Sequence, residues 1–147
     1  MSGQLNQEIK NSRPFASLEV EAALNIQCTG DFLEKWTDSV LEPAGLRADQ
    51  YNVLRILRGA GAEGHPSSEV RKRMVQDTDR LPGLVHTLRA RGLIEGTLRL
   101  TITDAGRTLL ASVDDTLDNA IRERLGRIDA AKLRMVVEVM ERLRSDS

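Results

Sequence analysis

The fold is decided by the stretch LVHTLRARGLI, which runs from Leu84 to Ile94. Its first part repeats leucine and valine at the three-and-four spacing of a helix, and Gly92 then stands where helices commonly end in a left-handed residue. After Gly92 the period changes: Leu93-Ile94 is a short apolar pair, and from Leu98 to Ile102 apolar and polar residues alternate. Alternation predicts two short strands, joined by a turn at residues 95–97.

Helices are predicted on both sides of this stretch. Before it, apolar periodicity favours helices over residues 17–41 and 48–58, and Ser67 or Ser68 can cap a third. The helix that contains Leu84 is expected over residues 80–91. After the hairpin, Thr103 can cap a long helix and Asp129 a last one. Three compact helices followed by a hairpin indicate a mainly α fold with a small β-hairpin, namely a winged helix-turn-helix.

The domain organisation follows from this order. Residues 1–16 are polar and are predicted to be a flexible N-terminal arm, and residues 17–147 a single domain. Within it, 46–103 forms the winged helix-turn-helix, flanked by helices in 17–45 and 104–147. Burying one Leu or Val side chain stabilises the protein by about 1.5–3 kcal/mol. The core of so small a domain cannot cover the apolar stripes of the flanking helices. They are therefore predicted to be dimerisation helices in a homodimer.

The charge is unevenly distributed along the chain. Residues 47–107 contain 11 Lys/Arg and 7 Asp/Glu, an excess of +4, whereas the flanks contain 10 and 15, an excess of −5; together they give the net charge of −1. A basic middle between acidic ends favours a local surface that faces phosphate, although an excess of this size can also arise by chance.

Several classes of protein are disfavoured. No apolar run approaches the roughly 20 residues that a bilayer requires, and the first residues do not resemble a secretory signal, so we expect a cytoplasmic protein with no membrane partner. A single cysteine argues against disulfide frameworks and multi-cysteine zinc sites. No phosphate loop, nucleophile motif, metal-ligand spacing or cofactor motif is present, so we expect neither enzyme activity nor a metal or cofactor.

Four segments in order carry a resemblance to a known family: LRADQYNVLRIL (46–57), SEV (68–70), LVHTLRARGLI (84–94) and ITDAGR (102–107). From about Ser17 onward the chain resembles the MarR family of bacterial transcriptional regulators. The resemblance implies a homodimer that reads a pseudo-palindromic operator in double-stranded DNA, with the helix over 80–91 in the major groove. It also implies a repressor that is released by a small aromatic ligand.

The sequence departs from the family pattern at two places. Pro82-Gly83 replaces a Thr-Arg pair at the front of the recognition helix, and the wing is short, with Arg99 as its only basic residue. The residues expected to contact DNA are Ser67, Ser68, Arg80, Gly83, His86, Thr87 and Arg99. The alternative is a winged-helix dimer with degraded DNA binding that binds a small molecule or a protein.

Three other residues have two interpretations each, and a fourth has one. Trp36 and Tyr51 can line an effector pocket between the dimerisation helices and the winged helix-turn-helix (residues 46–103, the reading head). Aromatic residues are, however, more often part of the core. Cys28 could sense oxidants, yet no basic residue is adjacent to it, which favours a buried structural cysteine. His65 is expected to be a solvated loop residue.

Overall fold

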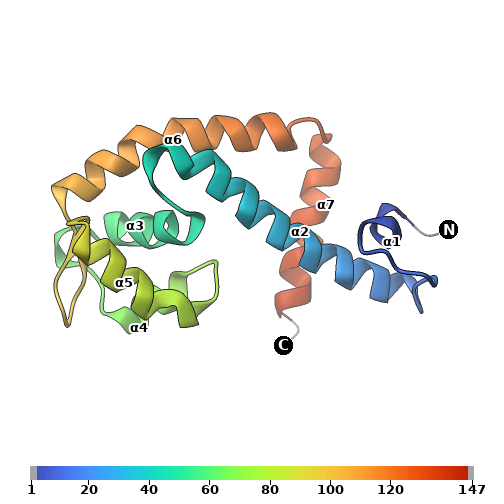
Figure 1. Ribbon diagram of the computed structural model, residues 1–147, viewed down its shortest axis with the longest axis horizontal. Coiled ribbons are helices and arrows are strands. Elements are labelled where there is room, and N and C mark those ends of the chain that lie inside the picture. Colours follow the sequence, from blue (N-terminus) through green and yellow to red (C-terminus); the bar gives the residue numbers. More distant parts are fainter. Residues whose placement is uncertain (1–2, 146–147) are drawn as a thin grey trace.

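The computed structural model describes residues 3–145, which are mainly helical (Figure 1). The helices and strands, in chain order, are α1 (Gln4–Glu8), α2 (Leu18–Leu41), α3 (Ala48–Ala60), α4 (Ser67–Arg73), α5 (Leu81–Ala90), β1 (Ile94–Glu95), β2 (Thr101–Ile102), α6 (Asp104–Leu125) and α7 (Ala130–Ser145). Short 3-10 turns precede α3, α4 and α5. The predicted fold class, mainly α with a small β-hairpin, is confirmed.

Side-chain caps determine where most of the long helices begin. Ser17 accepts the backbone N–H of Val20 at the start of α2, and Thr103 accepts that of Gly106 at the start of α6. Asp129 accepts the N–H of Lys132 in the first turn of α7. The expected serine cap of α4 is wrong, because a proline occupies the cap position and both serines already lie within the helix.

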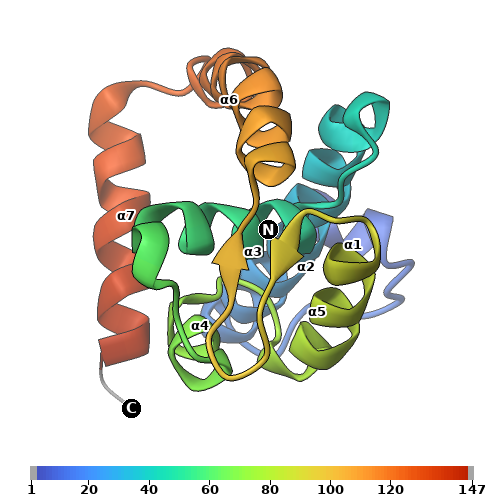
Figure 2. The same ribbon diagram turned by 90° about the vertical axis from the view of Figure 1, so that its left-hand side faces the viewer.

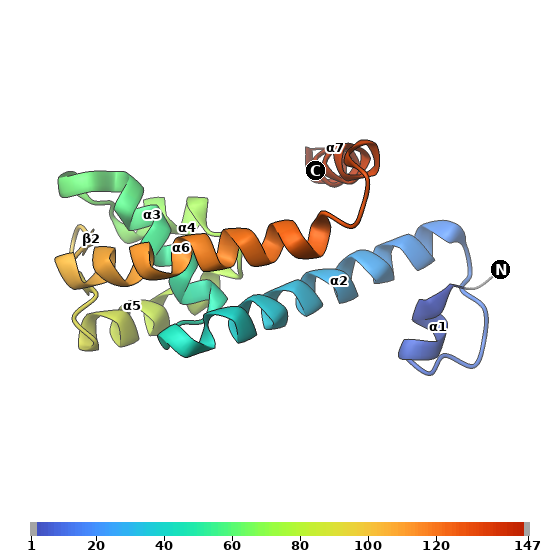
Figure 3. The same cartoon turned by 90° about the horizontal axis from the view of Figure 1, so that it is seen from above.

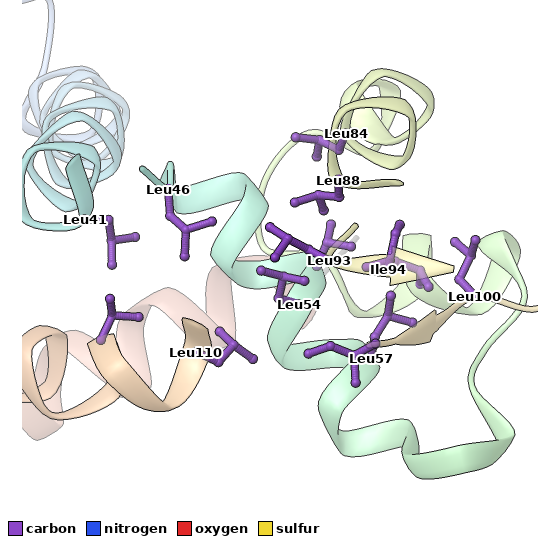
Figure 4. Packing of buried hydrophobic residues seen from close by; sticks show 14 of the residues in the cluster. Leu41, Leu46, Leu54, Leu57, Leu84, Leu88, Leu93, Ile94, Leu100 and Leu110 are labelled. Atoms are coloured by element: carbon purple, nitrogen blue, oxygen red, sulfur yellow. The ribbon is translucent and has the colours of Figure 1, made fainter. Parts of the chain in front are cut away.

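The core lies where α3, α5, the hairpin and the start of α6 meet (Figure 4). Its most deeply buried side chains include Leu54 and Leu57 of α3, Leu88 of α5, and Leu100 and Leu110 beyond it. All five are fully buried, and each such leucine stabilises the fold by about 1.5–3 kcal/mol. The apolar positions that identify the helices in the sequence are therefore the ones that hold the reading head together.

The wing is a minimal antiparallel hairpin in which Ile94 pairs with Ile102 (Figure 2). The second strand is shorter than the alternation predicts, because Gly96 turns the chain at φ +99° and brings residues 96–99 into a tight loop. Leu98 consequently lies in this loop and is 88% exposed. A bridge between His65 and Leu100 adds the segment before α4 to the edge of the hairpin.

The helices outside the reading head form an elongated extension. α2 and α6 lie side by side, and α7 turns away from the end of α6 (Figure 3). No residue of α7 is buried in the protomer, and Met135, Val136 and Leu143 are 61%, 49% and 62% exposed. Within residues 3–145, no helix combines the length and the apolar composition needed to span a bilayer.

The segment predicted to be a flexible arm contains a helix. Leu5 of α1 is 3% exposed, and the Gly3 N–H donates to the Glu21 carboxylate of α2 at 3.1 Å. Within the five residues of α1 only Leu5 is apolar, which is too weak a signal to predict this helix from periodicity.

Candidate nucleic-acid interface

The helix α5, predicted to be the recognition helix, has a buried face and an exposed face. Leu81, Leu84 and Leu88 point into the core, whereas Pro82, Gly83, His86 and Thr87 are exposed. Proline is tolerated here because the first-turn N–H groups of a helix lack intrahelical partners. The structure thus places Gly83, His86 and Thr87 together on the outward face, as the sequence predicts.

The short helix α4 brings a basic end to the same part of the molecule. Arg71, Lys72 and Arg73 form its last turn and are exposed, which also suits the negative end of a helix dipole. The Glu69 carboxylate forms ion pairs with Arg73 at 3.2 Å and with Lys72 at 3.8 Å. Among residues 3–145, Arg71 makes no ion pair. Its position in the run RKR is a signal that the sequence-based site prediction missed.

The two predicted serine contacts of α4 differ in exposure. Ser68 is exposed, whereas Ser67 is half-buried in the first turn. Only Ser68 therefore presents its side chain fully to the outside.

Arg80 does not point away from the protein as a base-reading side chain would. Its guanidinium pairs with Glu34 of α2, and the same nitrogen lies 3.5 Å from the Asp49 carboxylate of α3. Asp49 is 1% exposed and also accepts from Arg47 at 2.8 Å. The hydrogen bond with Glu34 raises the pKa of Arg80 above its ordinary value. Arg80 thus belongs to an ion cluster that joins it to α2 and α3.

The arginines around the wing also form hydrogen bonds with backbone carbonyls of the protein. Arg99 donates through Nε to the Glu63 carbonyl at 2.9 Å and through Nη2 to the Gly64 carbonyl at 3.0 Å. Arg89 donates to the Gly96 carbonyl at 2.6 Å. Arg99, predicted to reach DNA, therefore anchors the hairpin to the loop that precedes α4.

A cavity of about 610 Å³ lies between the reading head and the two long helices. Its wall is formed by α2 (Gly30, Leu33, Glu34, Thr37), α3 (Ala48, Tyr51, Asn52, Arg55), the segment before α5 (Val75, Gln76, Asp77) and α6 (Leu117, Ile121). Of the two predicted pocket residues, Tyr51 lines this cavity and Trp36 does not. Tyr51 is half-buried and also packs against the core.

The Tyr51 hydroxyl is held by Asp114 of α6. It donates to Asp114 at 2.8 Å, and Arg58 donates to the same carboxylate at 2.6 Å. Burial, and then the Asp114 carboxylate, raise the pKa of Tyr51 to about 12. The Arg58 guanidinium lowers the pKa of Asp114 below its ordinary value. This trio ties the reading head to α6 at the cavity wall.

Trp36 lies where α2 meets α6. The Arg124 guanidinium sits 5.2 Å from its ring and 4.7 Å from the Phe32 ring. Such cation–π contacts contribute about 0.5–1 kcal/mol at exposed sites. Trp36 is half-buried and supports the contact between the long helices.

Two other sequence interpretations need correction. Cys28 is exposed on α2 and not buried, because it lines an open groove between α2 and the short helix α1. His65 is half-buried, and its backbone pairs with Leu100 in both directions, at 3.0 and 2.8 Å. His65 is therefore not a solvated loop residue, because its backbone hydrogen bonds with Leu100 attach it to the edge of the wing.

Comparison with known proteins gave matches among solved structures only. No protein-family profile matches the chain. No curated protein matches it either.

Three of the similar structures are informative. A MarR family transcriptional regulator from Streptomyces coelicolor aligns with a TM-score of 0.77 at 25% identity, over 88% of this chain and 96% of that one. A MarR family protein from Mycobacterium tuberculosis in complex with DNA aligns at 0.64 and 22%, over 88% and 98%. CouR from Rhodococcus jostii, bound to p-coumaroyl-CoA, aligns at 0.73 and 23%, over 88% and 95%. The chain has the winged-helix fold of the MarR family of transcriptional regulators.

Proposed function

We propose that the protein is a cytoplasmic DNA-binding transcriptional regulator that reads a pseudo-palindromic operator. The observation that carries this proposal is the outward face of α5, where His86 and Thr87 are exposed above a fully packed face. The basic end of α4 adds charge for phosphate contacts. The similar Mycobacterium tuberculosis protein in complex with DNA supports the same use of the fold.

A homodimer is part of this proposal. The exposed apolar side chains of α7, among them Met135, Val136 and Leu143, have no partner element in the protomer that covers them. A second copy would bury them, and two recognition helices would then be presented to half-sites about one helical turn apart. Static light scattering at micromolar concentration should give twice the chain mass, and a monomeric mass would contradict the dimer.

Repression that is relieved by a small aromatic ligand completes the proposal. The cavity has the size of ordinary ligand sites, about 300–1,000 Å³, and its walls belong to both the long helices and the reading head. An occupant that changes their spacing would move the two recognition helices relative to each other. CouR, which is similar in fold, is bound to p-coumaroyl-CoA, an aromatic thioester.

The test is a fluorescence-anisotropy titration with duplex DNA from around the protein's own gene, at several salt concentrations. Saturable binding should exceed that of scrambled DNA and weaken with salt, because each neutralised phosphate contributes about 0.9 to the logarithmic salt slope. His86→Ala should reduce the preference for the genomic duplex over the scrambled one. Equal affinity for both duplexes would contradict a sequence-specific regulator.

A second function is favoured by the arginine contacts. Arg80, Arg89 and Arg99 bind the protein itself, which leaves the reading head with few free cations. A winged-helix dimer of this kind could bind a small molecule in the cavity, or a protein, with little DNA affinity. Absence of DNA binding at low salt, together with thermal stabilisation by an aromatic acid, would favour this alternative.

A further inference from the structure

Arg80 stands at the junction of three elements. It is the residue before α5, while Glu34 comes from α2 and Asp49 from α3. Without Arg80, Asp49 would still accept from Arg47 at 2.8 Å and from the Gln50 N–H at 2.8 Å. Within residues 3–145, the Glu34 carboxylate makes no other hydrogen bond or ion pair. Glu34 is therefore the partner dedicated to Arg80.

Because of its position, the pairing of Arg80 with Glu34 affects whether this guanidinium is available to DNA. A guanidinium at the start of a recognition helix stands where helix N-termini approach DNA phosphates. The Glu34 and Arg80 side chains are 28% and 39% exposed, so the ion pair forms in contact with solvent. A pair exposed in this way is weak, and a phosphate can compete for the cation. Glu34 is also one of the residues that line the cavity.

We propose that Glu34 restrains the DNA affinity of this protein by holding Arg80 against α2, so that loss of the Glu34 charge releases Arg80 to a DNA phosphate. This role deepens the proposed function and rests on its DNA binding. Arg80 would then supply a DNA contact only after its release, in a reading head that lacks the usual arginine at Pro82-Gly83. Its release would add one phosphate contact to those made by the basic end of α4.

The experiment is a double-mutant cycle with Glu34→Gln and Arg80→Ala. Binding is measured by anisotropy on a fluorescein-labelled, mixed-sequence duplex of about 30 base pairs, roughly three helical turns. Mixed-sequence DNA suffices because phosphate contacts do not depend on sequence. Asp31→Asn is the matched control, since Asp31 is also on α2 and pairs with Lys35 at 2.9 Å, but makes no hydrogen bond or ion pair with Arg80.

Glu34→Gln should bind more tightly than the wild type and steepen the logarithmic salt slope by about 0.9. Its advantage should therefore shrink about 3.5-fold between about 50 and 200 mM salt. Arg80→Ala alone should change the affinity little, and the double variant should show no gain over Arg80→Ala. Asp31→Asn should leave the slope unchanged. If Glu34→Gln does not fold, Glu34→Met keeps a similar volume without the charge.

Three results would overturn the restraint while DNA binding stands. They are an unchanged slope in Glu34→Gln, a gain that persists without Arg80, and a loss of slope in Arg80→Ala alone. The second would indicate a general charge effect, and the third that Arg80 already contacts DNA. Binding by Glu34→Gln but not by the wild type would support the restraint. Absence of salt-sensitive binding in both would overturn the proposed function as well.

Discussion

Replacing Gly106 with alanine should destabilise the protein, although alanine is the better helix former. Gly106 lies in the first turn of α6, directly against the wing. A Cβ there would lie 2.4 Å from the Leu93 carbonyl oxygen and 2.7 Å from Cγ1 of Ile102. The Leu93 carbonyl cannot move freely, because it accepts the Thr103 N–H at 3.0 Å.

The magnitude follows from the displacement required. Ordinary contact begins at 3.4 Å, so the start of α6 must move away from the Leu93 carbonyl by about 1 Å (3.4 minus 2.4). Forcing one extra carbon into a packed site costs about 1–3 kcal/mol, and a clash with a hydrogen-bonded backbone carbonyl belongs in the upper part of that range, about 2–3 kcal/mol. The gain in helix propensity offsets about 1 kcal/mol of this. Gly106→Ala should thus lose about 1–2 kcal/mol, or roughly 2–8 °C in melting temperature.

Gly83→Ala is the matched control, because the chemical change is the same. A Cβ at Gly83 meets nothing within 4 Å, and the residue lies in the helix α5. It should gain up to about 1 kcal/mol from helix propensity. Urea unfolding followed by circular dichroism, at one fixed protein concentration, compares the two variants with the wild type. Gly106→Ala as stable as the wild type would refute the packing argument.

Three further predictions concern other parts of the molecule. The chain has a single tyrosine, so absorbance titration should show Tyr51 ionising near pH 12; its raised pKa stabilises the fold below about pH 10, and that stabilisation is lost as the pH rises towards 12. Asp114→Asn should lower this midpoint only partly, since burial remains, and an unchanged midpoint would count against the contact. Arg99→Ala should reduce the free energy of unfolding by about 1 kcal/mol by losing its carbonyl contacts, with no change in salt slope; a flatter slope would show that Arg99 contacts DNA. Val136→Asp should convert the proposed dimer to monomers in light scattering, whereas Leu98→Asp on the wing should not.

The reading head could be predicted from the sequence because its signals are local. The change of period at Gly92 and the leucines of α3 and α5 lie within single elements, and the structure buries Leu54, Leu57 and Leu88. Fold class follows from such periodicity, since the same residues that repeat along a helix also pack against the core.

The contacts of the candidate site could not be predicted in the same way. Arg80 and Glu34 are separated by 46 residues, and Arg99 and Glu63 by 36, so no spacing rule connects them. Helical periodicity predicts Arg80 on the outward side of the helix expected over residues 80–91, but a long flexible side chain can turn back to a carboxylate on another element. The exposure of Cys28 likewise depends on how α1 and α2 meet, which local sequence does not determine.

The stacking of Arg124 on Trp36 gives the molecule a built-in optical signal. The chain has one tryptophan, so all indole emission comes from the place where α2 meets α6. The intensity and wavelength of that emission depend on the nearby guanidinium and on access of water to the ring. Unlabelled protein can therefore report, in a fluorimeter and in real time, whether these two helices separate when subunits assemble or a small molecule enters.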